Sequence, residues 1–145
     1  MDILKYFKFE DVGKRLEDLE TPVPVIDIDV VLRNLTRWQA RCDAKGFANR
    51  PHIKTHKLVP LALAQIELGA KGITVQKLGE AEVMAAGGIT DMLLTFNVVG
   101  GHKLQRLADL MRRTEIKVVA DSAVVLDGLS HAAAQAGRDL TVLVE

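Results

Sequence analysis

The sequence has little cysteine, no excess of either charge and no long apolar run. Cys42 is the only cysteine in 145 residues, which excludes an internal disulfide and a cysteine-based metal knuckle. Nineteen basic and nineteen acidic residues cancel to a formal net charge of zero, so the positive excess that binds nucleic acid or anionic membranes is missing. No apolar run reaches transmembrane length. These absences predict a cytoplasmic protein without nucleic-acid or membrane partners.

The composition is that of a globular domain. Hydrophobic residues make up 48% of the chain and charged residues 26%, which excludes a disordered class. A chain of 145 residues is long enough to bury a substantial core. Cys42 falls within a helical pattern, and we predict that it is a buried structural thiol.

Strand and helix patterns alternate along the chain. Short apolar runs predict strands at residues 25–29, 73–76, 91–97, 116–120 and 140–145. Apolar residues at helical spacing predict helices at residues 30–41, 58–68, 79–88, 103–113 and about 121–136.

Several residues mark where the predicted helices begin and end. Two prolines within residues 21–24 prevent a helix there, because proline lacks the amide donor and restricts the residue before it. We expect Asp29 to cap the first long helix, and Asp121 or Ser122 to cap the last one. Gly137 is expected to end that last helix.

The alternation, with no hairpin signal, requires parallel strands joined by crossover helices. Four or five βα units are compatible with a doubly wound sheet or with part of a (β/α)₈ barrel. Residues 1–20 are expected to form a short helical lead-in, and residues 21–145 the α/β domain. The last strand runs to Glu145 without a helix to cover it, and we interpret the chain as the N-terminal part of a longer protein.

In a parallel α/β fold, sites lie at the carboxyl ends of the strands. Four groups are expected there: Lys54 with His52 and His56, Gln76 with Lys77, Asn97, and Asp121 with Ser122. Burial and the positive charges of Arg50 and Lys57 are expected to favour the neutral amine of Lys54, the form that Schiff-base chemistry requires.

Ordinary structural roles compete with these interpretations. On composition alone, the basic run around Lys54 is more often a solvated loop than a site. Asp121 and Ser122 are predicted to act as a helix cap and not as a catalytic pair. His102 and His131 fall at a helix start and in mid-helix, and we predict surface or packing roles for both.

Two runs in order resemble the D-threonine aldolase and D-serine dehydratase family, pyridoxal-phosphate enzymes of the alanine racemase fold class. They are RPHIKTHK at residues 50–57 and GITVQKLGEAE at residues 72–82. Residues 21–29 and 118–122 also match, so the resemblance covers residues 21–145. It implies that the fold is a partial (β/α)₈ barrel of the alanine racemase N-terminal kind.

The resemblance also implies roles for individual residues. Lys54 would carry pyridoxal phosphate as a Schiff base, with His52 and Thr55 beside it. Gln76 would lie against the cofactor from the next strand, and Asn97 is a weaker candidate for the same role. The family also implies a divalent metal, whose ligands fall beyond this chain together with the rest of the barrel and a C-terminal β domain.

The predicted function is therefore that of a lyase acting on small D-3-hydroxy amino acids, by retro-aldol cleavage or by elimination of water, with the 145-residue chain inactive on its own. The resemblance implies a possible homodimer. Three alternatives remain open: an amino-acid racemase, a non-catalytic pyridoxal-phosphate protein of the same fold, and a structural module without a cofactor.

Overall fold

The computed structural model describes residues 3–6 and 13–145. Its first described segments are two short 3₁₀ helices, η1 (Ile3–Tyr6) and η2 (Leu16–Asp18). Tyr6 donates a hydrogen bond of 2.5 Å from its hydroxyl to the Glu67 carboxylate, which attaches η1 to the helix that contains Glu67. Part of the predicted lead-in, including Phe7 and Phe9, lies outside the described residues.

Four parallel strands form one sheet in the order in which they occur along the chain. They are β1 (Ile73–Val75), β2 (Asp91–Leu94), β3 (Glu115–Ala120) and β4 (Thr141–Val144). Each crossover contains one helix, as parallel pairing requires. The alternation read from the sequence is thus confirmed for the chain from β1 onward.

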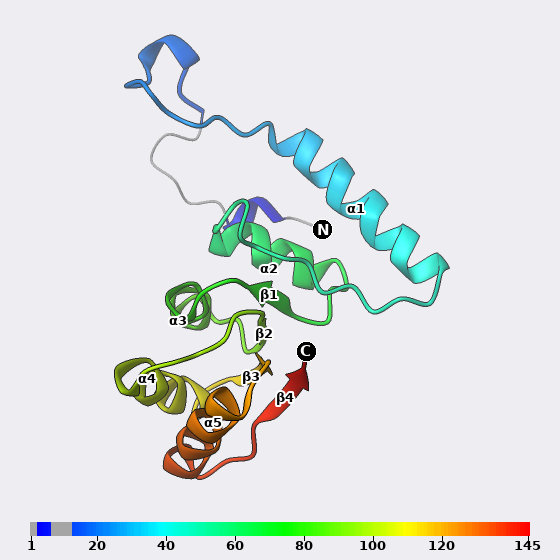
Figure 1. The fold of residues 1–145 in the computed structure, drawn as a ribbon. Coiled ribbons are helices and arrows are strands. Elements are labelled where there is room, and N and C mark those ends of the chain that lie inside the picture. Colours follow the sequence, from blue (N-terminus) through cyan, green and yellow to red (C-terminus); the bar gives the residue numbers. More distant parts are fainter. Residues whose placement is uncertain (1–2, 7–12) are drawn as a thin grey trace.

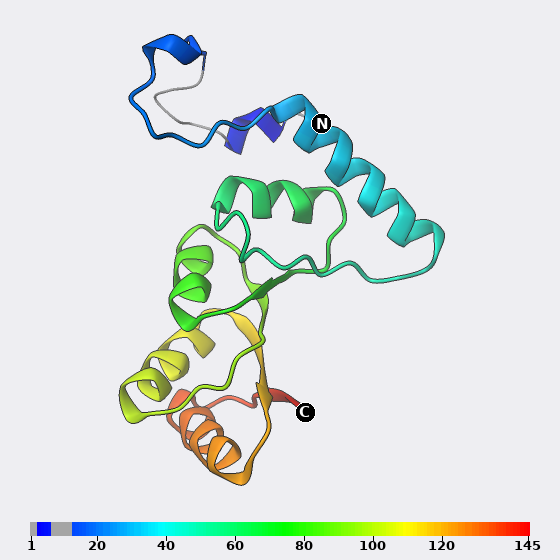
Figure 2. The same cartoon turned by 45° about the horizontal axis from the view of Figure 1, so that its top comes forward.

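The helices are α1 (Ile28–Ala44), α2 (Val59–Glu67), α3 (Leu78–Ala86), α4 (Gly101–Met111) and α5 (Ala123–Ala136). Helices α3, α4 and α5 stand side by side along one face of the sheet (Figures 1 and 2). A doubly wound sheet would carry helices on both faces, whereas a barrel carries them only outside. The arrangement is therefore that of a partial barrel, which confirms the predicted fold class.

The core lies between the sheet and these helices. Strand β1 is buried along its whole length, whereas β4 is mostly exposed. One apolar cluster contains side chains that are at most 2% exposed, among them Ile53, Met92, Leu107 and Leu129. Burial of such side chains is the main contribution to the stability of the fold.

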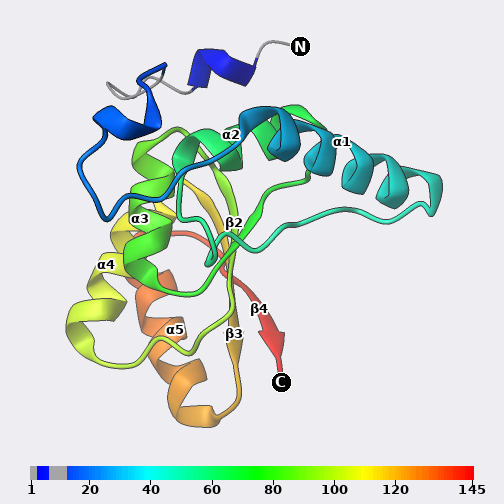
Figure 3. The ribbon, with the colours of Figure 1, turned by 90° about the horizontal axis from the view of Figure 1, so that it is seen from above.

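The strand predicted at residues 25–29 is wrong. The chain is irregular up to Asp27, and α1 begins at Ile28. A strand is held by hydrogen bonds to a neighbouring strand, but Val25 and Ile26 are 62% and 46% exposed and do not join the described sheet. Figure 3 shows α1 projecting away from the strands.

The predicted helix caps also need correction. Asp27, not Asp29, caps α1, because its carboxylate accepts hydrogen bonds of 3.0 Å from the amides of Asp29 and Val30. Ser122 stands at the N-cap of α5 without a capping side-chain hydrogen bond. Gly137 ends α5 in the left-handed conformation, with φ of 66°, as predicted.

Cys42 is buried in α1 as a free thiol, which confirms its predicted structural position. Among the described residues, no helix is both long and apolar enough to cross a membrane.

Candidate functional site

The segment that contains Lys54 is attached to the first strand of the sheet. His52 forms an isolated parallel bridge with Thr74 of β1. Ile53 is fully buried, and its amide donates a hydrogen bond of 2.9 Å to the Thr74 carbonyl. The chain then turns, which leaves Lys54 exposed at the carboxyl end of β1. The sequence predicted Lys54 at the carboxyl end of a strand, and the bridge of His52 places it beside the end of β1.

His52 contacts two of the other predicted site residues. Its Nδ1 accepts a hydrogen bond of 3.2 Å from the Lys54 amide. Burial lowers the pKa of His52, and the charge of Lys54 lowers it further, while a hydrogen bond with the Gln76 side chain acts in the opposite direction. A neutral ring that accepts at Nδ1 carries its proton at Nε2. His52, Lys54 and Gln76 therefore form one cluster.

The positive field predicted around Lys54 is not found. Arg50 points to the opposite end of the sheet, where both of its terminal nitrogens lie 2.9 Å from carboxylate oxygens of Asp91. Lys57 lies 3.3 Å from the carboxylate of Glu80. Both cations are thus paired with acids, and Lys54 is exposed instead of buried. Its amine has no hydrogen bond or ion pair with any described residue.

Glu80 is a site residue that the sequence did not reveal. One carboxylate oxygen accepts a hydrogen bond of 2.8 Å from the Gln76 amide, and the other faces Lys57. Burial acts to raise the pKa of Glu80, but the Gln76 amide and the Lys57 ammonium outweigh it, so that this pKa lies below its usual range. The sequence feature that could have indicated a role for Glu80 is its position in the first turn of α3.

Thr55 and Asn97 have no described contact with Lys54. Thr55 is exposed in the turn. Asn97 follows β2 and is partly buried, and its Oδ1 is enclosed without a hydrogen-bond partner among the described residues. An enclosed polar atom without a partner is costly unless a bound group or water satisfies it. Asn97 is therefore available to a ligand, although the structure does not connect it to the cluster.

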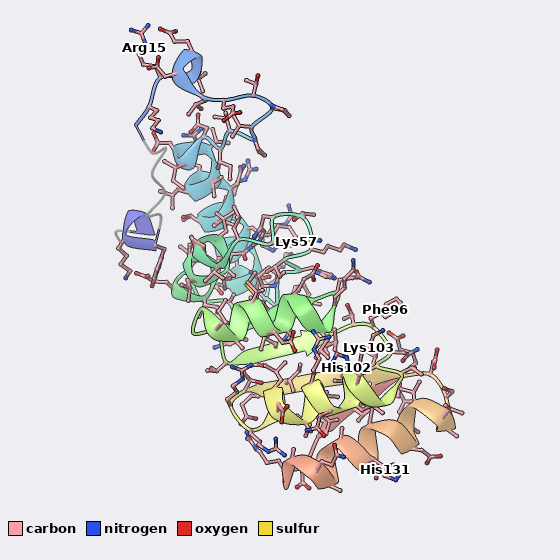
Figure 4. The ribbon with its side chains drawn as sticks, turned by 90° about the vertical axis from the view of Figure 1, so that its left-hand side faces the viewer. Arg15, Lys57, Phe96, His102, Lys103 and His131 are labelled. Carbon is pink, nitrogen blue, oxygen red and sulfur yellow. The ribbon has the colours of Figure 1, made fainter. Side chains whose placement is uncertain are left out.

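The remaining histidines play local roles. His56 Nδ1 accepts a hydrogen bond of 3.0 Å from the Leu58 amide, just before α2. His102 and His131 are exposed, in agreement with the prediction of surface positions. Figure 4 shows His102 and Lys103 at the start of α4 and His131 on α5.

The cluster is suited to an aldehyde cofactor and not to a metal. An accessible primary amine beside a neutral imidazole and an amide side chain can bond covalently to a carbonyl carbon. Among the residues that the structure describes, no group of histidine, cysteine or acidic side chains could hold a metal ion.

Comparison with known proteins gives one family and a consistent set of relatives. The family model for the alanine racemase N-terminal domain matches residues 26–145. D-threo-3-hydroxyaspartate dehydratase of Delftia sp. (strain HT23) is 41% identical over 88% of this chain and 33% of its own length. D-threonine aldolase of Arthrobacter sp. is 42% identical over 92% of this chain and 35% of its own length.

Solved structures agree with these sequence matches. The crystal structure of D-threonine aldolase from Filomicrobium marinum superposes with a TM-score of 0.86 at 40% identity, over 89% of this chain and 35% of that chain. D-threo-3-hydroxyaspartate dehydratase from Delftia sp. HT23 gives a TM-score of 0.76 at 40% identity. The present chain thus spans about a third of the length of these relatives.

Proposed function

Because the chain belongs to the alanine racemase N-terminal domain family, which is pyridoxal-phosphate dependent, we propose that Lys54 is the cofactor lysine of a lyase acting on D-3-hydroxy amino acids. The observation that carries this proposal is the position of Lys54. Its amine is exposed at the carboxyl end of β1, beside His52 and Gln76 and without an ion-pair partner among the described residues.

Each predicted site residue has a proposed part in holding the cofactor. Lys54 would bind it through the side-chain amine, and His52 and Gln76 would contact it from the bridge and from the end of β1. Thr55 in the turn and Asn97 after β2 are proposed as further contacts. When bound, pyridoxal phosphate supplies the electron sink, while the protein supplies binding and orientation.

Two reactions on the same substrate class fit this proposal. Retro-aldol cleavage breaks the Cα–Cβ bond after the 3-hydroxyl loses its proton, and it releases an aldehyde. Elimination removes the Cα proton and expels the hydroxyl as water. Relatives named for each reaction match to a similar extent, at 42% and 41% identity. We propose the substrate class and not one of the two outcomes.

The other parts of the proposal concern the whole protein. Residues 21–145 would form part of the barrel, and a divalent metal is proposed as a second cofactor. We propose a cytoplasmic enzyme and a homodimer. A small D-amino acid would be its substrate.

The test is a product analysis of the intact protein incubated with pyridoxal phosphate and either D-threonine or D-threo-3-hydroxyaspartate. An aldehyde product indicates cleavage, whereas ammonia with a 2-oxo acid indicates elimination. We expect Lys54→Ala to abolish turnover, since the amine that binds the cofactor is lost. Lys71→Ala, an exposed lysine just before β1, is the control and should keep wild-type turnover. Full activity of Lys54→Ala would overturn the proposal.

A further inference from the structure

The turn that carries Lys54 contains a strained backbone. Lys57 has a φ of 53°, the only positive φ of a non-glycine residue among the described residues. A left-handed conformation is unfavourable for a side chain with a Cβ and persists only where surrounding contacts hold it. Contacts of Lys57 must therefore stabilise this backbone conformation.

Two contacts hold Lys57 in this conformation. Its amide donates a hydrogen bond of 2.8 Å to the Ile53 carbonyl, which closes the turn around Lys54. Its ammonium lies 3.3 Å from Glu80 Oε1. The Glu80 side chain is only 10% exposed, whereas the Lys57 side chain is 55% exposed, so solvent screens this pair mainly from the Lys57 side.

The second oxygen of Glu80 reaches the other half of the cluster. Glu80 Oε2 accepts a hydrogen bond of 2.8 Å from the amide of Gln76, whose side chain meets His52. One carboxylate thus joins the turn that carries Lys54 to the end of β1. A shift of this carboxylate would move Lys54 and Gln76 relative to each other.

From these contacts we infer that Glu80 is a positioning residue, which fixes the Lys54 turn against Gln76 through its ion pair with Lys57. The inference rests on the proposed role of Lys54. A purely structural alternative exists, because an acid in the first turn of a helix can satisfy a free backbone amide there. The two roles differ in whether the Lys57 ion pair matters.

Glu80→Gln separates the two roles. Glutamine keeps a side-chain oxygen for the Gln76 amide but loses the charge that pairs with Lys57. Lys57→Asn removes the same ion pair from the other side, and asparagine tolerates the left-handed conformation. Lys57→Arg keeps the charge. Glu82→Gln is the matched control, because Glu82 lies on the same helix but pairs with Arg106.

The readout is the rate at which pyridoxal phosphate forms a borohydride-reducible adduct at Lys54 in the intact protein. We expect Glu80→Gln and Lys57→Asn each to slow this rate by about tenfold, since small displacements of a reacting group are costly. The double variant should be no slower than either single variant, because both remove one interaction. Lys57→Arg and Glu82→Gln should react at the wild-type rate.

Amide hydrogen exchange gives a second readout that needs no cofactor. In Glu80→Gln we expect faster exchange at the Lys57 amide and unchanged exchange at the Gln76 amide. If Glu80→Gln instead forms the Lys54 adduct as fast as Glu82→Gln, Glu80 is only a helix cap and the inference fails. Absence of a Lys54 adduct in the wild type would refute the proposed function itself. The exchange rate of the Lys57 amide would then show by itself whether the ion pair with Glu80 holds the turn. If Glu80→Gln does not fold, Lys57→Asn provides the test.

Discussion

His52 connects the backbone of the lysine turn to the side chain of Gln76. The ring accepts from the Lys54 amide at Nδ1, so its proton belongs at Nε2. A doubly protonated ring could not accept this hydrogen bond. The protonation state of His52 therefore matters for the conformation of Lys54.

We predict that His52 titrates below the ordinary value of 6.5, because burial and the charge of Lys54 disfavour the imidazolium. The ¹⁵N chemical shifts of the His52 ring, measured by NMR as the pH is varied through this value, should show Nδ1 without a proton at neutral pH. The Lys54 amide resonance should shift with the same midpoint as the His52 ring. A midpoint above 6.5, or a proton on Nδ1 at neutral pH, would contradict this account.

The sequence predicts well which residues lie at the site. It predicts poorly which of these residues contact one another. Strand ends are visible in the apolar pattern, and they bring Lys54 and Gln76 to the same edge. The pairing of Arg50 joins residues that are 41 positions apart, so no local pattern shows that its charge is neutralised by Asp91. The ion pair between Lys57 and Glu80 could not be predicted from the sequence for the same reason, because its partners lie on separate segments of the chain.

At the scale of elements, Asp91 ties three segments of the sheet together. It stands at the start of β2 and accepts from Arg50, which precedes the bridge of His52. It also accepts a hydrogen bond of 2.7 Å from Lys117 of β3. Gly72 makes room for these contacts, because a Cβ there would lie 2.5 Å from the Asp91 carbonyl oxygen.

We predict that Asp91→Asn lowers the free energy of unfolding by about 1 to 2 kcal/mol at pH 7, since the two cations lose their partner. Burial acts to raise the pKa of Asp91, but the hydrogen bonds from Arg50 and Lys117 prevail and lower it below 3.8. The stabilisation is therefore complete above about pH 3.8 and is lost as the pH falls further.

Denaturant unfolding of the wild type and Asp91→Asn at pH 7 and at about pH 3 measures this effect. The difference between the two proteins should shrink at the lower pH. Asp109→Asn is the control, because Asp109 of α4 forms an exposed ion pair with Arg112, the residue that follows the helix, and should change stability little. A difference that stays constant with pH would show that the Asp91 charge is not responsible.

Most of the predicted elements from β1 onward are present, because periodic apolar patterns record which face is buried. The strand expected at residues 25–29 is the main failure. Val25 and Ile26 have the residue types of a strand, but pairing is a tertiary property that propensity does not determine. The carboxylate of Asp27 then starts α1 directly after this segment.

At the scale of the whole molecule, the strand order explains why the site lies where it does. Strands β1 to β4 run parallel in chain order with helices on one face, so the segments that follow the strands emerge at one edge. Lys54, Gln76 and Asn97 come from three successive units and all lie toward this edge. The partial barrel thus provides the surface on which the proposed cofactor site is built.

The most direct test of this account is the absorbance spectrum of the protein with pyridoxal phosphate, taken before and after borohydride reduction and followed by peptide mapping. We expect a reduced adduct confined to Lys54, with Lys57 and Lys77 unlabelled. Lys54→Arg should lose the spectral change. Labelling spread over many lysines, or none at all, would contradict the assignment of Lys54 as the cofactor residue.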